Sequence, residues 1–235
     1  MIAIPIILAL VSGYLIGSVM TAVKIAKKRN RDIHKCGSGN AGSTNILRTF
    51  GWKWGLICLA SDSLKGVLSV LCGCFIGWIF ETTGWVKAAY DIKEFMSYVG
   101  LLGAMIGHLL PVFYNFRGGK CVSVALGGFL TISPVELLIA LAIALLLIAA
   151  TRMVSVGSVI GTILAAAFII IKHWGNIPLT VLCVIIAAVV VIAHLPNIQR
   201  IAEGHERRLE RIEWEKRENE NKEKTADNNT ETSKK

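Results

Sequence analysis

The segment best suited to chemistry is a glycine-rich loop, CGSGNAGSTNILRTFG, at residues 36–51. Such a loop can turn several backbone N–H groups toward one point, and its small hydroxyl and amide side chains add donors without blocking a ligand. A phosphate is the natural ligand, with a plain flexible linker as the alternative. The loop lacks the G-x-x-x-x-G-K-[ST] pattern of nucleotide sites. The expected phosphate contacts are Gly37, Ser38, Gly39, Asn40, Gly42, Thr44, Asn45 and Arg48.

A second loop, HLLPVFYNFRGGKCVSV at residues 108–124, combines two adjacent glycines with basic side chains. Gly118 and Gly119 would let the backbone approach a ligand closely, and Lys120 with Arg117 would supply phosphate donors. A basic pair beside a membrane also serves orientation alone, which is its commonest use. His108 is as well suited to a structural hydrogen bond as to ligand binding.

Two more polar sets follow. The segment TRMVSVGSV at residues 151–159 offers Ser155 and Ser158, although such residues often serve helix packing. The segment HLPNIQR at 194–200 offers His194 and Asn197, which share a helical face if the helix persists past Pro196. Farther upstream, Asp62 and Lys65 are three residues apart and are expected to pair with each other.

The composition indicates that these loops join membrane helices. The chain has 235 residues, a net charge of +9, 54% hydrophobic residues and a mean hydropathy of +0.58. After Arg200 there are 9 Lys and Arg against 10 Asp and Glu, so the surplus positive charge belongs to the apolar part of the chain. This excludes a nucleic-acid-binding domain and favours a membrane protein with basic loops on one side. We expect no nucleic-acid partner.

Uncharged or nearly uncharged stretches predict an all-α membrane protein with seven spans, because about 20 apolar residues cross a bilayer. The stretches are 1–23, 54–80, 95–116, 121–135, 137–150, 153–171 and 177–193. The two between 121 and 150 are short and separated by Ser133-Pro134, so they are expected as short or half helices, or as one kinked hairpin or re-entrant pair. The excess of Lys and Arg in the first loop predicts an outside N-terminus and a cytoplasmic C-terminus.

Two regions follow from this pattern: a transmembrane domain over residues 1–200 and a charged cytoplasmic tail over 201–235. The tail is expected to be helical to about Lys222 and disordered beyond it, because its charges suit a solvated helix while its end is polar. The six cysteines show no C-x-x-C pair and no histidine at ligand spacing. No metal site and no cofactor are therefore expected.

The motifs GSGNAGSTNILRTFG, DSLKG, GHLLPVFYNFRGGK and HLPN, in this order, resemble those of the bacterial acyl-phosphate:glycerol-3-phosphate acyltransferases, the PlsY-type membrane enzymes. The resemblance runs from the first span to about Gly204. It implies seven transmembrane helices and an active site on the cytoplasmic side of the bacterial inner membrane. It also implies acyl transfer from acyl phosphate to the sn-1 hydroxyl of glycerol 3-phosphate, giving lysophosphatidic acid and phosphate, the first step of phospholipid synthesis.

The resemblance assigns active-site positions to Ser38, Arg48, Lys120, His194 and Asn197. Its implied partners are glycerol 3-phosphate, acyl phosphate, membrane lipid and an enzyme that synthesises the acyl phosphate. The chain departs from the family pattern at Cys121, where a glycine is common, and at Leu195-Pro196, where polar residues are common. These departures bear on the local backbone and on the geometry of His194.

The residues suit direct attack by the glycerol hydroxyl. Arg48 and Lys120 would neutralise phosphate charge, while Ser38 and the loop N–H groups would stabilise the developing oxyanion or leaving phosphate. His194, supported by Asn197, would act as general base or only orient the substrate, and the donor's own phosphate is an equally suitable base. There is no G-x-S-x-G elbow for a covalent route. The rival hypothesis is a transporter of a small organic phosphate, although such sites usually lie near the bilayer midplane.

Overall fold

The computed structural model describes residues 2–86 and 90–209, and within these ranges the chain is helical with no strand. The α-helices are α1 (Ala3–Gly17), α2 (Thr21–Lys28), α3 (Ser43–Phe50), α4 (Trp52–Thr82), α5 (Ile92–Leu109), α6 (Val122–Ile132), α7 (Pro134–Thr151), α8 (Val154–Lys172), α9 (Ile177–Ala193) and α10 (Leu195–Ala202). Two 3-10 turns, η1 (Ile33–Lys35) and η2 (Val112–Tyr114), lie in the connections. The all-helical expectation is confirmed for the described residues.

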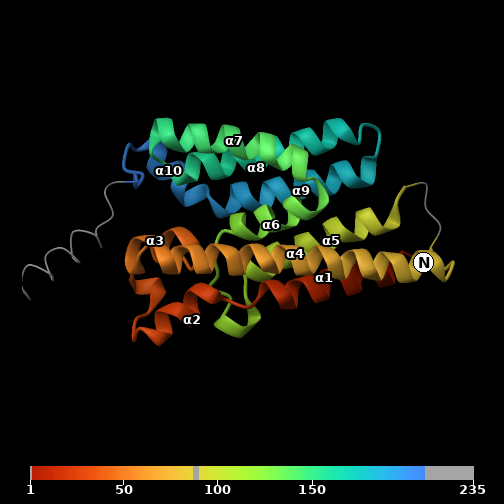
Figure 1. The fold of residues 1–235 in the computed structure, drawn as a ribbon, viewed down its shortest axis with the longest axis horizontal. Coiled ribbons are helices and arrows are strands. Elements are labelled where there is room, and N and C mark those ends of the chain that lie inside the picture. The colour runs from red at the N-terminus through yellow and green to blue at the C-terminus, as the bar shows by residue number, and fades with distance from the viewer. Residues whose placement is uncertain (1, 87–89, 210–235) are drawn as a thin grey trace, which may run out of the picture.

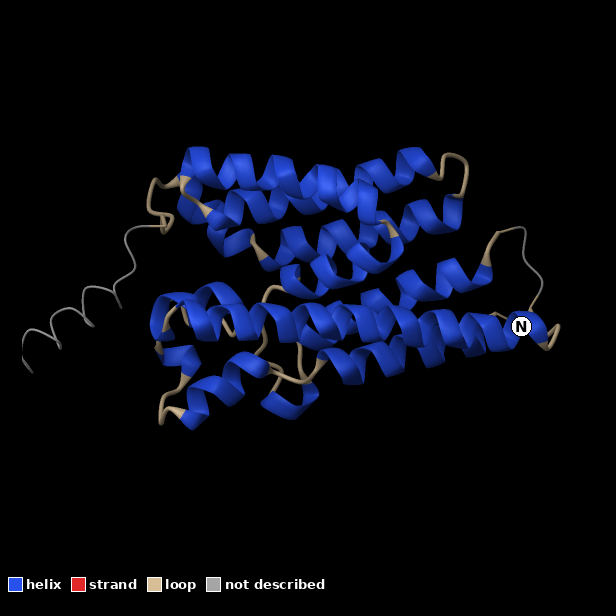
Figure 2. Cartoon of the chain, in the orientation of Figure 1, coloured by secondary structure: helices blue, strands red, loops and turns tan. Residues whose placement is uncertain are grey.

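The long helices run side by side along the long axis of the molecule (Figures 1 and 2). The helices α1, α4 and α5 form one group, α7, α8 and α9 form another, and α6 lies between them (Figure 1). The N-terminus lies at one end of the bundle, and the short helices α2, α3 and α10 gather at the opposite end (Figure 1). The polar segments at 36–51, 151–159 and 194–200 have their loops at this end (Figure 1).

Helix lengths test the expected number of spans in part. Five helical segments are individually long and apolar enough to cross a membrane, and α9 with α10, bent by 56°, makes a sixth. The predicted span at 121–135 contains only the 11-residue α6, because α6 ends at Ile132 and Pro134 opens α7. The first predicted span is also interrupted, between Gly17 and Thr21. The described residues therefore contain five or six full-length spans and the short α6, and the expected seven crossings are not confirmed.

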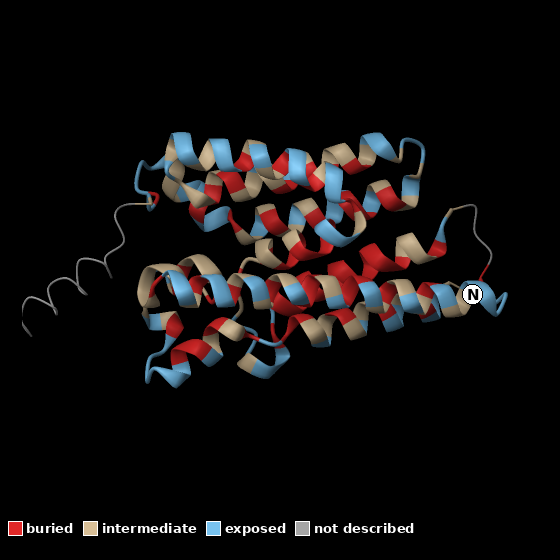
Figure 3. Cartoon of the chain, in the orientation of Figure 1, coloured by how far each residue is buried: buried red, intermediate tan, exposed pale blue. Residues whose placement is uncertain are grey.

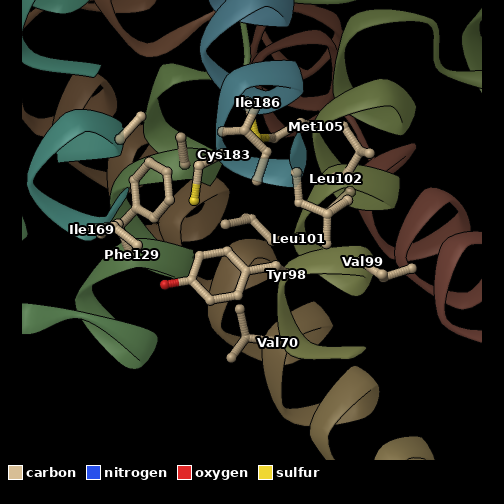
Figure 4. Close-up of a cluster of buried hydrophobic side chains, with 14 of the residues drawn as sticks. Val70, Tyr98, Val99, Leu101, Leu102, Met105, Phe129, Ile169, Cys183 and Ile186 are labelled. Carbon is tan, nitrogen blue, oxygen red and sulfur yellow. The ribbon is translucent and has the colours of Figure 1, made fainter. Parts of the chain in front are cut away.

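The buried side chains lie where the two groups of helices meet, and large apolar side chains cover the outside (Figure 3). The helix α5 is the most enclosed of the long segments, and its Tyr98, Leu101 and Met105 are fully buried. Phe129 of α6 and Ile186 of α9 pack in the same cluster (Figure 4). An apolar exterior of this kind is what lipid contact requires, because the bilayer interior cannot hydrate polar groups.

Close approach between helices depends on glycine. A Cβ on Gly13 of α1 would overlap the carbonyl oxygen of Gly100 on α5, and a Cβ on Gly66 of α4 would overlap that of Val124 on α6. Small residues at such crossings let the helix backbones touch, which is how helices associate in a membrane. These contacts hold α6 against α4, and α6 follows directly after the loop that carries Lys120.

The start of the tail differs from the expectation of a continuous helix. The helix α10 ends at Ala202, Gly204 adopts a left-handed conformation with φ of 75°, and residues 205–209 form no helix. The rest of the expected tail helix and disordered end, residues 210–235, lies outside the described residues. A glycine past the last helical turn is a common stop, because it takes a positive φ without steric cost.

Candidate active site

A cavity of about 660 Å³ lies at the end of the bundle where α3 and α10 gather. Its polar lining comes from the loop before α3, from Lys120 and from residues 194–207. Its apolar lining comes from α4, α6, α7 and α8, and includes Leu59, Leu126, Phe129, Leu141 and Ala165. One cavity thus combines a cationic polar end with a wall fit for a hydrocarbon chain.

The apolar part of this cavity also opens sideways. Trp52 and Leu56 of α4 and Leu145 of α7 line the cavity, yet each is more than half exposed at the surface of the molecule: 53%, 56% and 56%. The cavity therefore communicates with the apolar exterior between α4 and α7. This side opening is a second route of access besides the polar end.

Eleven of the fifteen residues expected in the site line the cavity: Ser38, Asn40, Gly42, Thr44, Asn45, Arg48, Lys120, Ser155, Ser158, His194 and Asn197. The other four, Gly37, Gly39, Gly118 and Gly119, do not. Other parts of the chain pack closely against these glycines. A Cβ on Gly118, for example, would overlap the carbonyl oxygens of His108 and Leu109. The structure shows these glycines permitting the loops to pack rather than facing the cavity.

Asn45 organises the first loop. Its side-chain oxygen accepts a hydrogen bond from the Ser38 N–H at 2.9 Å, and its amide nitrogen donates to the carbonyls of Cys36 and Asn40, both at 3.0 Å. A further contact reaches the Ile33 carbonyl at 3.4 Å. Asn45 is 1% exposed, so these bonds are shielded from water. The polar atoms of the Asn45 side chain therefore form hydrogen bonds within the protein and hold the loop that carries Ser38.

Arg48 stands on the last turn of α3, and its side chain is half buried in the cavity wall. Burial lowers the pKa of Arg48, the nearby Arg207 lowers it further, and Glu206 opposes both. Arginine nevertheless stays charged at any physiological pH because its ordinary pKa is so high. The cavity therefore contains a permanent cation whose hydration is already reduced.

Lys120 begins a chain of hydrogen bonds across the polar end. Its Nζ donates to Oδ1 of Asn197, whose Nδ2 donates to Oε1 of Glu206 at 2.6 Å. The Ser155 hydroxyl donates to the same carboxylate oxygen at 2.8 Å, and Nε of Arg200 donates to the other one at 3.0 Å. Burial lowers the pKa of Lys120 to about 8, with Glu206 opposing the shift. The network fixes three residues expected in the site.

Glu206 is the main site residue that sequence reasoning missed. It lies in the segment expected to be a solvated helix, yet it is 9% exposed and lines the cavity. Burial raises its pKa, but hydrogen bonds from Asn197, Ser155 and Arg200 outweigh burial and hold the pKa below its usual value. Gly204, which ends α10 and allows the chain to turn back, was the only available signal.

His194 lies at the 56° bend between α9 and α10 and is 3% exposed. Its Nδ1 is 2.8 Å from the carbonyl oxygen of Val190, so the ring donates from Nδ1 and keeps Nε2 as an acceptor. Pro196 falls in the first turn of α10, where it lacks only an N–H that needs no partner. The unusual Leu195-Pro196 pair is therefore compatible with a basic Nε2 in the site.

Cys121 occupies a backbone position that favours glycine. Its φ is 55°, in the left-handed region, and it precedes the first turn of α6. The side chain is 1% exposed. The departure from the family's common glycine therefore leaves the backbone shape in place, at some conformational cost.

Metal-ligating side chains do not gather in the described part of the chain: no three His, Cys, Asp or Glu residues there are placed to hold an ion. The cations of the site are Arg48, Lys120, Arg200 and Arg207. Positive charge for an anionic ligand is thus supplied by side chains.

Together these features define a class: a multi-pass helical membrane protein with a cationic, phosphate-sized polar site continuous with an apolar groove. Comparison with known proteins identifies the family. The family profile described as Glycerol-3-phosphate acyltransferase matches residues 7–204. The chain belongs to this family.

Among relatives, the glycerol-3-phosphate acyltransferase of Geobacter sulfurreducens is 38% identical over 84% of this chain and 94% of its own. The Thermus thermophilus enzyme of the same name is 37% identical over 87% and 96%. A crystal structure of PlsY (YgiH), an integral membrane glycerol 3-phosphate acyltransferase, in its glycerol 3-phosphate form has a TM-score of 0.75 at 29% identity. It covers 88% of this chain and 97% of that one. The lysophosphatidic acid form gives a TM-score of 0.72.

Proposed function

We propose that this protein transfers a fatty acyl group from acyl phosphate to the sn-1 hydroxyl of glycerol 3-phosphate. The observation that carries the proposal is the single cavity in which Arg48, Lys120 and His194 meet an apolar groove. One reactant is a soluble phosphate and the other is a lipid, so their reaction needs a cationic pocket that opens onto hydrocarbon. Membership of the family supports the same reaction.

In the proposed reaction the hydroxyl oxygen attacks the acyl carbonyl carbon, the bond from that carbon to the phosphate oxygen breaks, and inorganic phosphate leaves. Arg48 and Lys120 neutralise phosphate charge, which is greatest on the leaving group. Ser38, Ser43 and Thr44 line the same cavity, and Ser38 with the first N–H groups of α3, which lack partners within the helix, can stabilise the oxyanion. The hydroxyl proton passes to Nε2 of His194 or directly to the departing phosphate.

We assign the remaining expected residues to two tasks. Asn40, Gly42, Thr44, Ser155 and Ser158 line the cavity and are proposed to contact substrate. Gly37, Gly39, Gly118, Gly119 and Asn45 are proposed to act indirectly, by giving the loops their shape. Asn197 orients Lys120.

For the membrane arrangement, we propose seven crossings in which α6 is a short helix that completes the alternation between α5 and α7. The N-terminus is then outside and α10 lies on the cytoplasmic side, because the two lie at opposite ends of the bundle (Figure 1). The site opens to the cytoplasm at the bacterial inner membrane. An enzyme that makes acyl phosphate is the expected partner, since a lipid-soluble donor must reach the groove.

The test is to mix the purified protein with acyl phosphate and glycerol 3-phosphate and to measure lysophosphatidate and released phosphate together. Equal amounts of the two products are expected. The absence of turnover, with uptake of glycerol 3-phosphate into vesicles that contain the protein, would instead favour the transporter hypothesis. The site's position at one end of the bundle argues against a transporter.

A further inference from the structure

A buried group of ionisable side chains adjoins the cavity and has no part in the reaction as described above. Asp62 and Lys65 on α4 form an ion pair of 2.6 Å, which confirms the pairing expected from their spacing. His108, near the end of α5, lines the cavity and is 2% exposed. Charged groups inside membrane proteins are costly, so such a group is a functional candidate by default.

The geometry of Lys65 determines which nitrogen of His108 carries the proton. The Lys65 Nζ lies 2.6 Å from Oδ1 of Asp62, 2.5 Å from the Val19 carbonyl oxygen and 3.3 Å from Nδ1 of His108. An ammonium group has three protons and no acceptor, so it donates to the Val19 carbonyl oxygen and to Nδ1 of His108, while Oδ1 of Asp62 is its ion-pair partner. His108 therefore accepts at Nδ1, and its neutral ring carries the proton on Nε2.

The Asp62 carboxylate stabilises this arrangement. Its Oδ1 is 4.0 Å from Nδ1 of His108, farther than the Lys65 ammonium, and its Oδ2 accepts from the Cys58 thiol at 3.5 Å. The carboxylate keeps Lys65 charged in a site with little water. Without this partner the buried ammonium would be an uncompensated charge, which is strongly unfavourable. The pair thus acts on His108 as a permanent donor at Nδ1.

The glycine pair of the second loop lies against His108. The Gly119 N–H donates to the His108 carbonyl oxygen at 3.0 Å, and a Cβ on Gly119 would overlap Nε2 of the His108 ring. The chain can pass so close only because Gly118 and Gly119 lack side chains, and Lys120 follows them directly. The Nε2–H of His108 and the ammonium of Lys120 consequently serve the same cavity.

We propose that His108 is a further substrate-binding residue whose Nε2–H donates to a substrate phosphate beside Lys120, and that Asp62 and Lys65 are positioning residues that fix its tautomer. A neutral donor suits this place because Arg48 and Lys120 already repel a third cation. Both substrates of the proposed reaction carry phosphate, so this inference rests on the proposed function for the identity of the ligand.

Two substitutions separate the two nitrogens of His108. In His108→Asn the amide oxygen can still accept from Lys65, but no donor remains at the position of Nε2. In His108→Gln the longer side chain can place an amide N–H near that position. Losing a hydrogen bond to a charged group should raise the KM for glycerol 3-phosphate or for acyl phosphate about tenfold or more in the Asn variant. The Gln variant should recover part of this loss.

The matched control is His173→Asn, because His173 pairs with Glu94 at 3.3 Å and belongs to the loop between α8 and α9, far from the cavity. This variant should leave both KM values unchanged. Separate titration of the two substrates shows which phosphate His108 contacts. If both KM values in His108→Asn stay within about twofold of those of the unsubstituted protein, the binding role is overturned.

The tautomer itself is measured in the unsubstituted protein. In protein labelled with ¹⁵N-imidazole, the signal of His108 should show a protonated Nε2 and an unprotonated Nδ1, and glycerol 3-phosphate should shift the Nε2–H resonance. Comparison with His108→Asn or His108→Gln identifies the signal. Protonation at Nδ1, or no shift on saturation, would refute the inference. An inactive wild-type protein that gave the expected spectra would refute the proposed reaction alone.

Discussion

The side chains of the polar end differ in what controls their charge. Arg48 remains a cation at every accessible pH, whereas Lys120 has a pKa lowered to about 8 by burial. A lysine in this state can change charge within the working range of the protein, and only its protonated form attracts phosphate. Phosphate binding should therefore depend on pH through Lys120.

Raising the pH through about 8 should lower kcat/KM for the phosphate substrates, because Lys120 loses its proton. Below that pH the ammonium form of Lys120 dominates, and kcat/KM should not change with pH. Lys120→Arg should flatten the alkaline decline, since arginine keeps its charge. Initial rates measured from pH 6 to 10 give the comparison.

Lys120→Ala should lower activity by at least about a hundredfold, since it removes a cation that interacts with the leaving phosphate. The neighbouring Cys121→Ser provides a control, because Cys121 contributes only packing and keeps its backbone conformation. Equal small effects of the two substitutions would contradict the assignment of Lys120.

His194→Ala distinguishes the two candidate bases. If Nε2 of His194 accepts the hydroxyl proton, kcat should fall by about 100-fold or more. A purified variant that retains most of its kcat would show that the histidine only orients substrate and that the phosphate accepts the proton. Single-turnover rates give the chemical step directly.

Glu206→Ala should destabilise the protein by about 2–4 kcal/mol, because it leaves the buried Asn197 amide and Ser155 hydroxyl without their acceptor. Since the folded-state pKa of Glu206 is lowered, its stabilising effect is present at neutral pH and is lost as the pH falls through that lowered pKa. Thermal unfolding in detergent measures the change.

The control is Glu203→Ala, whose exposed carboxylate accepts only from Gln199 at 3.0 Å in the described structure. It should change stability by less than about 0.5 kcal/mol. Similar losses of stability in both variants would mean that the turn after α10 is sensitive to any change and that the hydrogen bonds of Glu206 are not the cause.

At the scale of elements, the position of the site depends on how α4 meets α6. Gly66 allows the two backbones to touch, and α6 carries the end of the Lys120 loop. Gly66→Val should destabilise the fold by at least about 2 kcal/mol, because the added atoms would overlap the backbone of Val124. Ala60→Val creates the same β-branched side chain on the exposed face of α4 and should be nearly neutral. Unfolding in detergent compares them, and equal stabilities would contradict this account of the packing.

Features that depend on local sequence could be predicted, whereas features that depend on contacts between distant residues could not. The bounds of α9 were predicted without error, since an apolar run between polar ends fixes a membrane helix. A short segment at 121–135 was also predicted, because Pro134 separates it from the next helix, and α6 covers 11 residues of it. Glu206 could not be predicted, as its burial depends on a turn at Gly204 and on partners far away in sequence. Likewise, nothing local to Asn45 shows that its amide is engaged within the loop.

For the whole molecule, the ends of the described chain bear on membrane orientation. The N-terminus and α10 lie at opposite ends of the bundle (Figure 1). Epitope tags fused at the two termini should therefore be reached by protease from opposite sides of the membrane. The N-terminal tag should be cleaved in spheroplasts and the C-terminal tag in inverted vesicles. Cleavage of both tags from one side would contradict the odd number of crossings.

The side opening at Trp52, Leu56 and Leu145 determines how a lipid product can leave. Moving a fatty chain from lipid into water costs about 0.8 kcal/mol per methylene, so a chain of roughly sixteen carbons would face on the order of 12 kcal/mol. Passage between α4 and α7 avoids that desorption barrier. We expect the host bilayer to set the rate of product release, so that stiffer lipids slow turnover while the chemical step keeps its rate.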